Sequence, residues 1–353
     1  MLWSVALLGG LTVSGGTAAL RDAAERLAGG SPPSCHAAVT VLVFVVLLSV
    51  LNEIVALPLA FYNGFLVERQ YGLSRDTLRG WLGDQAKSFA IGVVLASGAA
   101  ELVYALIRWS PDRWWLTAGA AFTLLVVGLT NLAPVLLLPI FYTVKPLGRE
   151  ALRARLLALA ERAGARVLGA YEWGLGEKTK KANAALAGLG GTRRILVSDT
   201  MLAEFSDDEI EVVLAHEIAH HVHGDIWKGI AFESALIVAG FFLASQVLHA
   251  IAGLAGLRGE DDVAGLPLLL LAAGAVSVVM VPAAHAMSRG FERSADRFAL
   301  DLTNNPHAFI SAMRRLGAQN LAEEDPSKVV QWLFYSHPPV RDRIAAAQAF
   351  RIS

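Results

Sequence analysis

Long runs of apolar residues are the feature of this sequence that most restricts its fold. A transmembrane helix needs about 20 apolar residues to cross a hydrocarbon layer of about 30 Å. Six stretches of suitable length and composition occur, at 2–20, 37–61, 88–108, 115–143, 228–256 and 265–287. Charged residues make up only 17% of the chain, whereas about 25% is typical of soluble domains. The sequence therefore predicts a mainly α-helical, polytopic membrane protein.

The transmembrane spans divide the chain into membrane and aqueous parts. We expect two membrane segments, 1–144 with four spans and a transmembrane hairpin at 228–287. The segments 145–227 and 288–353 mix charged with apolar positions and are expected to be aqueous. Strand-like patterns at 171–173 and 194–198 predict a small β-sheet in the first aqueous part. Residues 2–20 lack the basic start and the cleavage pattern of a signal peptide, which favours a retained helix.

Basic residues in the loops predict the orientation, because Lys and Arg accumulate on the cytoplasmic side. The loop at 62–87 holds four of them, whereas the loops at 109–114 and 257–264 hold one each. Six spans then place both aqueous parts in the cytoplasm. A composition rich in Ala, Gly and Arg suggests a bacterial chain, and hence an inner-membrane protein.

Charge and cysteine content exclude several kinds of site. The 30 Lys and Arg residues are balanced by 31 Asp and Glu residues, so no basic excess points to a nucleic-acid partner. The single cysteine, Cys35, can form neither an intramolecular disulfide nor a Cys-based zinc site. Any metal must be held by histidine and carboxylate side chains.

His216, Glu217 and His220 form the His-Glu-x-x-His pattern of zinc proteases. Ser206 and Glu209 form a capping box that predicts the start of an amphipathic helix carrying this pattern. Side chains four residues apart share one helical face, so both imidazoles can bind one Zn²⁺. Glu217 can then take a proton from the zinc-bound water and pass it to the leaving amine. The pattern predicts hydrolysis of peptide bonds.

A catalytic zinc site needs a third protein ligand. Glu292 and Asp296 follow the last span and lie four residues apart on one predicted helical face. One of them could bind the metal while the other supports a ligand. The residues alone favour ion pairs with neighbouring arginines.

These motifs together carry a resemblance to a known family. The zincin helix, the Glu292-x-x-x-Asp296 pair and Ser336-His337-Pro338-Pro339 occur in the order and spacing of the type I CAAX prenyl proteases, which are integral-membrane zinc metalloendopeptidases. Further similar segments lie at 57–73, 133–147, 181–184 and 199–202. The likeness covers nearly all of the chain beyond residue 36.

The resemblance implies a helical barrel that encloses an intramembrane chamber, with a zinc site at its cytosolic end. In this family the matching residues make His216, His220 and Glu292 the zinc ligands and Glu217 the base, while Asp296 orients a ligand. The substrates would be peptides or proteins, including prenylated proteins cut near their C-terminal CAAX sequence, at the surface of a lipid bilayer.

The resemblance also implies roles for residues outside the metal site. Asn183, Ala184 and Ala185 would lie on an edge strand that pairs with the substrate, and His337 and Arg343 would line the cleft, His337 with a catalytic role. Local interpretations stay open: Asn183 as a turn residue, His337 as a cap before Pro338, and Arg343 as a surface charge.

Two other functions fit parts of the sequence. A membrane quality-control protease of the HtpX type shares the zincin helix but has fewer spans. A transporter or membrane chaperone with a degenerate metal site is a non-catalytic alternative, and the intact Glu217 argues against it. Prenylated proteins are not expected in most bacteria, so unlipidated membrane polypeptides are also candidate substrates.

Overall fold

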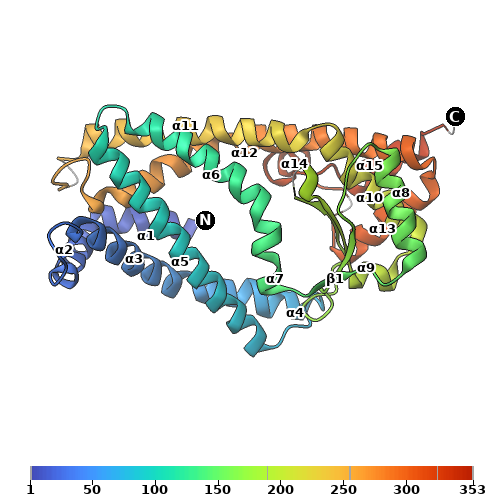
Figure 1. Ribbon diagram of the computed structural model, residues 1–353, viewed down its shortest axis with the longest axis horizontal. Helices are drawn as coiled ribbons and strands as arrows, with labels where there is room; N and C mark the ends of the chain where they lie inside the picture. Colours follow the sequence, from blue (N-terminus) through green and yellow to red (C-terminus); the bar gives the residue numbers. More distant parts are fainter. Residues whose placement is uncertain (1, 189, 254–255, 324, 352–353) are drawn as a thin grey trace. The chain divides into compact units, whose positions relative to one another are not determined.

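The computed structural model of the protein describes residues 2–188, 190–253, 256–323 and 325–351. Most of these residues are helical, and a small sheet lies between the helices (Figure 1). The chain forms two compact units. The first contains Met1–Val67, Leu78–Leu125 and Ala231–Val279, and the second contains Glu68–Thr77, Val126–Ile230 and Met280–Ser353. The mainly helical fold with a small mixed sheet confirms the predicted fold class.

The first unit consists of helices built from the apolar runs. Its elements are α1 (Leu2–Val13), α2 (Gly16–Ala28), α3 (His36–Phe61), the π-helix η1 (Tyr62–Val67), α5 (Leu78–Trp109), and parts of α6 (Trp114–Leu136), α11 (Asp225–Ile251) and α12 (Leu266–Thr303), which a short 3-10 helix, Val263–Gly265, precedes. Phe44, Tyr104, Trp114, Leu248 and Leu269 belong to its buried core. Large apolar side chains also face outward, Val94, Leu124 and Val279 among them, as expected for helices surrounded by lipid.

Four described helices are long and apolar enough to cross a membrane: His36–Gln70, Leu78–Trp109, Asp225–Ile251 and Val263–Thr303. The span expected at 115–143 is interrupted. Helix α6 ends at Leu136, and a four-residue helix, α7 (Leu138–Phe141), follows. Pro139 explains the break, because proline has no backbone N–H to continue a helix.

The segment expected as one helix at 2–20 is bent in the structure. The segment contains all of α1 and the start of α2, and the two helices meet at an angle of 81°. Gly15 adopts φ 75° at the junction, a left-handed conformation that glycine accepts without strain. The pair qualifies either as one broken span or as a re-entrant loop. If it is a broken span, the described residues contain five spans.

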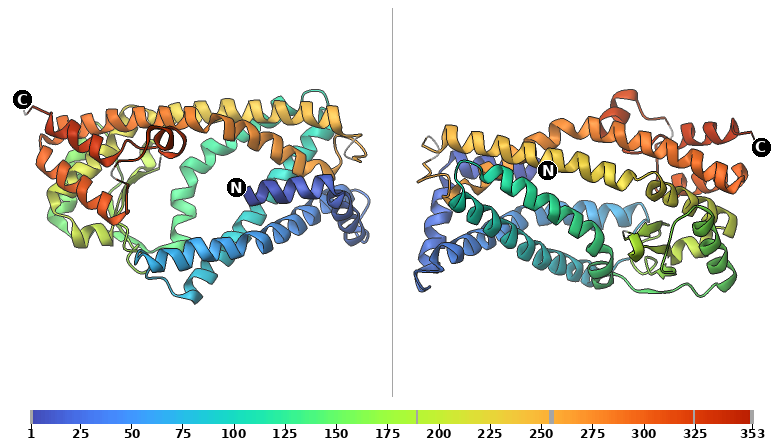
Figure 2. Two further views of the ribbon diagram at one scale, coloured as in Figure 1. Left: turned by 180° about the vertical axis from the view of Figure 1, so that it is seen from behind. Right: turned by 45° about the horizontal axis from the view of Figure 1, so that its top comes forward.

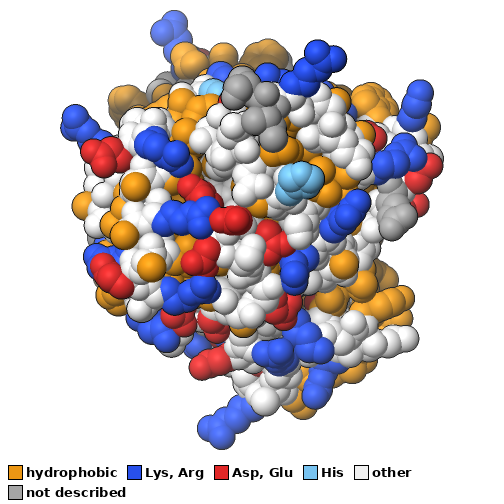
Figure 3. Space-filling model, turned by 90° about the vertical axis from the view of Figure 1, so that its right-hand side faces the viewer, with side chains coloured by type: hydrophobic (Ala, Val, Ile, Leu, Met, Phe, Trp, Pro, Cys, Tyr) orange, Lys and Arg blue, Asp and Glu red, His pale blue; other side chains and the backbone are white. Residues whose placement is uncertain are grey.

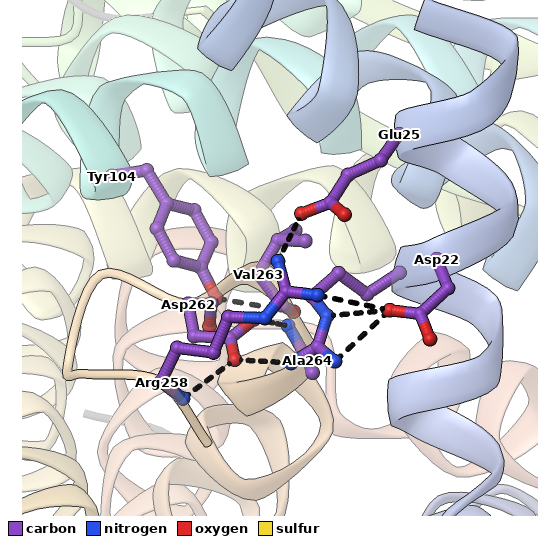
Figure 4. A network of polar contacts seen from close by, with 8 residues as sticks. Asp22, Glu25, Tyr104, Arg258, Asp262, Val263 and Ala264 are labelled. Atoms are coloured by element: carbon purple, nitrogen blue, oxygen red, sulfur yellow. Dashed lines mark hydrogen bonds and ion pairs between the residues drawn. The ribbon is translucent and has the colours of Figure 1, made fainter.

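A polar network holds α2 in the first unit (Figure 4). The buried Arg21 donates to Asp262 at 2.6 Å, in the loop before α12, and Arg258 of the same loop donates to Glu25 at 2.5 Å. The hydroxyl of Tyr104 donates to the backbone oxygen of Asp262 at 3.3 Å. These contacts explain how the charged helix α2 packs beside apolar neighbours, since its buried charge is paired.

The second unit contains a four-stranded sheet. Its strands are β1 (Val144–Pro146), β2 (Ala170–Trp173), β3 (Ala184–Ala187) and β4 (Arg194–Ser198), in the order β1-β2-β4-β3. Strands β2 and β4 are parallel, and the two outer pairings are antiparallel. The predicted strands at 171–173 and 194–198 are β2 and β4. Strand β3 lies at one edge of the sheet.

Helices complete the second unit. They are α4 (Glu68–Gln70), α8 (Glu150–Arg162), α9 (Asp199–Glu204), α10 (Asp207–Val222), α13 (Pro306–Gln319), α14 (Lys328–Phe334), α15 (Val340–Gln348) and the second half of α12. A short 3-10 helix, Gly190–Thr192, precedes β4. Leu156, Ile195, Leu214 and Phe309 are fully buried in the core between these elements.

The surface of the second unit differs from that of the first. On the side of the molecule where α8, α13 and α15 lie, Lys and Arg side chains are interspersed with Asp and Glu side chains (Figure 3). Arg155 of α8, for example, donates to Glu211 of α10 at 2.7 Å. Such a surface is suited to water.

Candidate active site

Helix α10 carries His216, Glu217 and His220, and its start is fixed by the predicted capping box. Ser206 accepts from the backbone N–H of Glu209, and Glu209 accepts from the backbone N–H of Ser206 at 2.8 Å. These two bonds satisfy N–H groups that have no partner within the helix. The residues Ile210, Leu214 and Ile218 are buried on one side of α10. The motif is therefore placed by a rigid, well-capped helix.

Glu292 of α12 lies opposite the two imidazoles. Its Oε2 atom is 3.2 Å from Nε2 of His216, and its Oε1 atom is 3.5 Å from Nε2 of His220. The three ligand atoms lie within 4.8 Å of one another. Oε2 is buried and has no hydrogen-bond partner among the described residues. Two imidazole nitrogens and an unsatisfied carboxylate oxygen are a donor set that fits Zn²⁺.

A carboxylate contacts the second nitrogen of each imidazole. Nδ1 of His216 lies 2.9 Å from Asp296, and Nδ1 of His220 lies 3.1 Å from Asp225. If each Nδ1–H donates to its carboxylate, each Nε2 keeps a free lone pair directed at the candidate metal position. Asp225 was not identified from the sequence, although it lies only five residues beyond His220.

Two nitrogen-bearing side chains from the C-terminal segment complete the cluster. Arg343 of α15 donates to Asp296 at 2.8 Å and lies 3.9 Å from Glu292. His337 has its Nε2 atom 3.2 Å from Glu292, and 60% of its side chain is exposed. Only 11% of the Arg343 side chain is exposed, so it is not a surface charge. The structure thus brings six of the predicted site residues together: His216, His220, Glu292, Asp296, His337 and Arg343.

The surroundings shift the pKa values of the groups on α10. Burial disfavours the charged form of His216, but the neighbouring carboxylates of Asp296 and Glu292 outweigh it and raise the pKa of His216 to about 9. Burial raises the pKa of Glu217, and the nearby His216 and His220 offset this only in part. A raised carboxyl pKa brings Glu217 closer to the range in which a general base works at neutral pH.

Asn183 lies directly before the edge strand β3. Its backbone oxygen accepts from the N–H of Ser198 in β4, and its N–H donates to the Ser198 hydroxyl, both at 2.9 Å. Because backbone directions alternate along a strand, the N–H and C=O groups of Ala184 and Leu186 point to the open edge, and those of Ala185 point to β4. His221 donates to the Leu186 oxygen at 2.8 Å, a contact that the sequence did not reveal. Substrate binding at this edge stays a prediction.

Comparisons with known proteins are consistent across the chain. Residues 146–351 match the model of peptidase family M48, and residues 1–143 match the model of the CAAX prenyl protease N-terminal region, described as five membrane helices. The uncharacterized metalloprotease YhfN of Bacillus subtilis is 31% identical over 309 residues, covering 86% of this chain and 72% of that protein. The human CAAX prenyl protease 1 homolog is 23% identical, covering 88% and 74%.

The fold has a counterpart among solved structures. The crystal structure of Ste24p from S. mikatae superposes with a TM-score of 0.82 at 23% identity, and the match covers 88% of this chain and 76% of that one.

Proposed function

Since this chain belongs to peptidase family M48, we propose that His216, His220 and Glu292 bind one Zn²⁺ and that Glu217 is the general base. The protein is a membrane metalloendopeptidase. The observation that supports zinc at this position is the convergence of two imidazole Nε2 atoms on the buried carboxylate of Glu292, with the three ligand atoms within 4.8 Å of one another.

The protein residues would divide the reaction between them. Bound Zn²⁺ lowers the pKa of a water ligand and polarises the peptide carbonyl. Glu217 accepts the proton of the attacking water and returns it to the leaving amine. Asp225 and Asp296 hold the two ligand imidazoles in one tautomer, and Arg343 balances the charge of Asp296. His337, which is partly exposed beside Glu292, donates a hydrogen bond to the carbonyl oxygen as it becomes negative.

An extended peptide would bind along the edge of the sheet. The open N–H and C=O groups of Ala184 can pair with a substrate backbone, and main-chain pairing of this kind is a common way of binding peptides. Asn183 and Ala185 hold the strand on β4 through their own backbone bonds. The carbonyl of Leu186 is already bonded to His221, so the substrate would pair with the part of the edge around Ala184.

The substrate class follows from the relatives by analogy. Several of them are named CAAX prenyl proteases, those of Schizosaccharomyces pombe and humans among them. We propose peptide or protein substrates cleaved at the membrane, with a prenylated C-terminal CAAX peptide as the candidate to test first. We also propose that the transmembrane helices enclose a chamber within the membrane. A transporter function is not supported, because it would not need Glu217.

The protein is a multi-pass membrane protein. We place it in a bacterial inner membrane, with the active site facing the cytoplasm. Support comes from the four basic residues between positions 62 and 87, where the helices His36–Gln70 and Leu78–Trp109 meet, since such residues remain on the cytoplasmic side.

One experiment tests both the chemistry and the substrate class. Purified protein and its Glu217→Gln variant are incubated with farnesylated and unlipidated peptides, and the products are sequenced. We expect the wild type to cleave the peptides and Glu217→Gln not to cleave them. A Glu161→Gln control, which changes an exposed residue of α8, should cleave like the wild type. Equal cleavage of lipidated and unlipidated peptides would remove the prenyl preference, and activity of Glu217→Gln would remove the mechanism.

A further inference from the structure

Helix α14 is apolar and yet unburied. Five of the seven residues of Lys328–Phe334 are apolar, and none is buried. Val329 is 65% exposed, Trp332 54% and Phe334 71%. A helix this short is not stable on its own in water, and contiguous apolar surface usually marks a contact with something else. The helix must therefore be held by its surroundings, and its apolar side chains need a partner.

Hydrogen bonds attach the C-terminal end of α14 to one turn of α12. His285 donates to the backbone oxygen of Leu333 at 2.9 Å. Arg289 donates to the backbone oxygens of Gln331 and Tyr335, at 3.0 and 2.6 Å. The Leu333 carbonyl is one that the helix itself leaves open, whereas the Gln331 carbonyl also accepts from the backbone N–H of Tyr335. Figure 2 shows α14 beside α12, joined to the rest of the chain by loops.

The turn that holds α14 lies where α12 changes from apolar to charged. From Leu266 to Met287 the helix contains no Asp, Glu, Lys or Arg, and Arg289 is its first such residue. A helix that crosses a bilayer makes this change at the boundary between hydrocarbon and headgroups. The bonds of His285 and Arg289 therefore place α14 at the depth of that boundary.

A second exposed tryptophan lies near the same level of α12. Trp227, in the first turn of α11, is 55% exposed. The ammonium group of its neighbour Lys228 lies 5.2 Å from the ring centre of Phe291, one turn after Met287. Tryptophan is enriched at membrane interfaces, and basic side chains there contact anionic headgroups. Trp227 and Trp332 thus mark the same layer from two different helices.

We propose that α14 lies in the interfacial layer of the bilayer. Val329 and Trp332, three residues apart on one helical face, contact acyl chains, Phe334 does so from the end of the helix, and Lys328 contacts headgroups. The lipid surface would thereby hold the segment that leads to His337, three residues beyond α14. The proposal does not depend on the identity of the metal or of the peptide substrate.

Site-directed spin labelling in lipid nanodiscs measures the depth of α14. Cys35 is the only cysteine, so a Cys35→Ser background allows single labels at Trp332→Cys and Val329→Cys. Val279→Cys, on the apolar part of α12 and 75% exposed, gives the value for lipid. Arg314→Cys, on the exposed side of α13, gives the value for water. Each label reports its accessibility to oxygen, which enters lipid, and to a nickel chelate, which stays in water.

The expected result is an oxygen-to-nickel accessibility ratio at positions 332 and 329 several-fold above that at 314 and closer to that at 279. Ratios equal to that of the Arg314→Cys label would overturn the proposal. So would labels that are open to both reagents and become protected only when a substrate peptide is added, since α14 would then be a substrate-binding surface. Unchanged thermal unfolding of each labelled variant confirms that the fold is intact.

Discussion

His220 and Asp225 are linked at 3.1 Å between Nδ1 and a carboxylate oxygen, across the turn that joins α10 to α11. Asp225 is buried, and its other oxygen accepts from Lys228 at 3.0 Å. The arrangement mirrors that of His216, whose Nδ1 faces Asp296. Both imidazoles are therefore oriented from behind by a carboxylate, which directs their Nε2 atoms toward the same point.

Replacing Asp225 by Asn should weaken the metal site without destroying it. The amide keeps the size of the side chain but not its charge, so His220 loses a partner that fixes its tautomer and raises its basicity. Loss of such a partner costs about 10–100-fold in metal affinity or activity. Zinc affinity is measured by competition with a chelator. Asp301→Asn, at an exposed ion pair of α12, is the control, and an affinity equal to that of the control would exclude the role of Asp225.

Loss of the base should separate chemistry from metal binding. Glu217→Gln keeps the shape of the side chain and leaves the proposed ligands in place, so bound zinc should remain at the wild-type level. Peptidase activity should fall by the 10²–10⁴-fold that is typical of lost general base catalysis, or by more. Metal analysis and turnover on the same sample check both parts, and turnover near the wild-type rate would contradict the assignment.

The two carboxylates of α12 should fail in different ways. Glu292→Ala removes one of three protein ligands and should give a metal-poor, inactive protein. Asp296→Asn removes an outer contact of His216 and should keep most of the zinc, with activity reduced about 10–100-fold. The zinc content of the two purified variants distinguishes these roles. Stoichiometric zinc in Glu292→Ala would move the third ligand elsewhere, with His223 and His337 the next residues to test.

The geometry of the edge strand gives a paired test of substrate binding. Ala184→Pro removes an N–H that points to the open edge, so it should raise KM about 2–10-fold, the cost of one hydrogen bond, while unfolding stays near wild type. Ala185→Pro removes an N–H that points to β4, so it should lower the unfolding temperature as well. Kinetics and thermal unfolding of both variants are compared. An unchanged KM in Ala184→Pro would leave Asn183 and its neighbours with a structural role only.

Local patterns were sufficient to predict the motif helix but not its partners. The capping box at Ser206 and the spacing of His216 and His220 depend only on helical periodicity, and the structure has both. Glu292 could not be assigned from its own surroundings, because the charged turn around it by itself favours surface ion pairs. Only the packing of α12 beside α10, which the family resemblance implied, distinguishes the two interpretations.

The features that the sequence missed depend on single backbone turns. Gly224 adopts φ 68°, which ends α10 and returns Asp225 toward His220, and no apolar pattern reports that reversal. Gly15 breaks the first predicted span in the same way. Hydrophobicity shows which residues avoid water, but it does not show where a left-handed glycine redirects the chain.

The last prediction concerns the pH dependence of stability at the start of α10. Burial alone would raise the pKa of Glu209, but hydrogen bonds from Ser311 and Ser206 and the charge of Arg315 outweigh it and hold the pKa below its usual value of 4.5. A carboxyl group whose pKa is lower in the folded state stabilises the fold above its unfolded pKa, and this stabilisation is lost as the pH falls through the lower, folded value.

Glu209→Gln should therefore be less stable than the wild type at neutral pH, by about 1–3 kcal/mol for a buried, charge-assisted network that loses one partner. The difference should shrink as the pH falls below about 4.5, because the wild-type carboxylate then becomes protonated as well. Thermal unfolding of both proteins across this pH range measures the difference, with Glu161→Gln on the exposed side of α8 as the control. A difference that does not vary with pH would mean that Glu209 stabilises α10 through its shape and not through its charge.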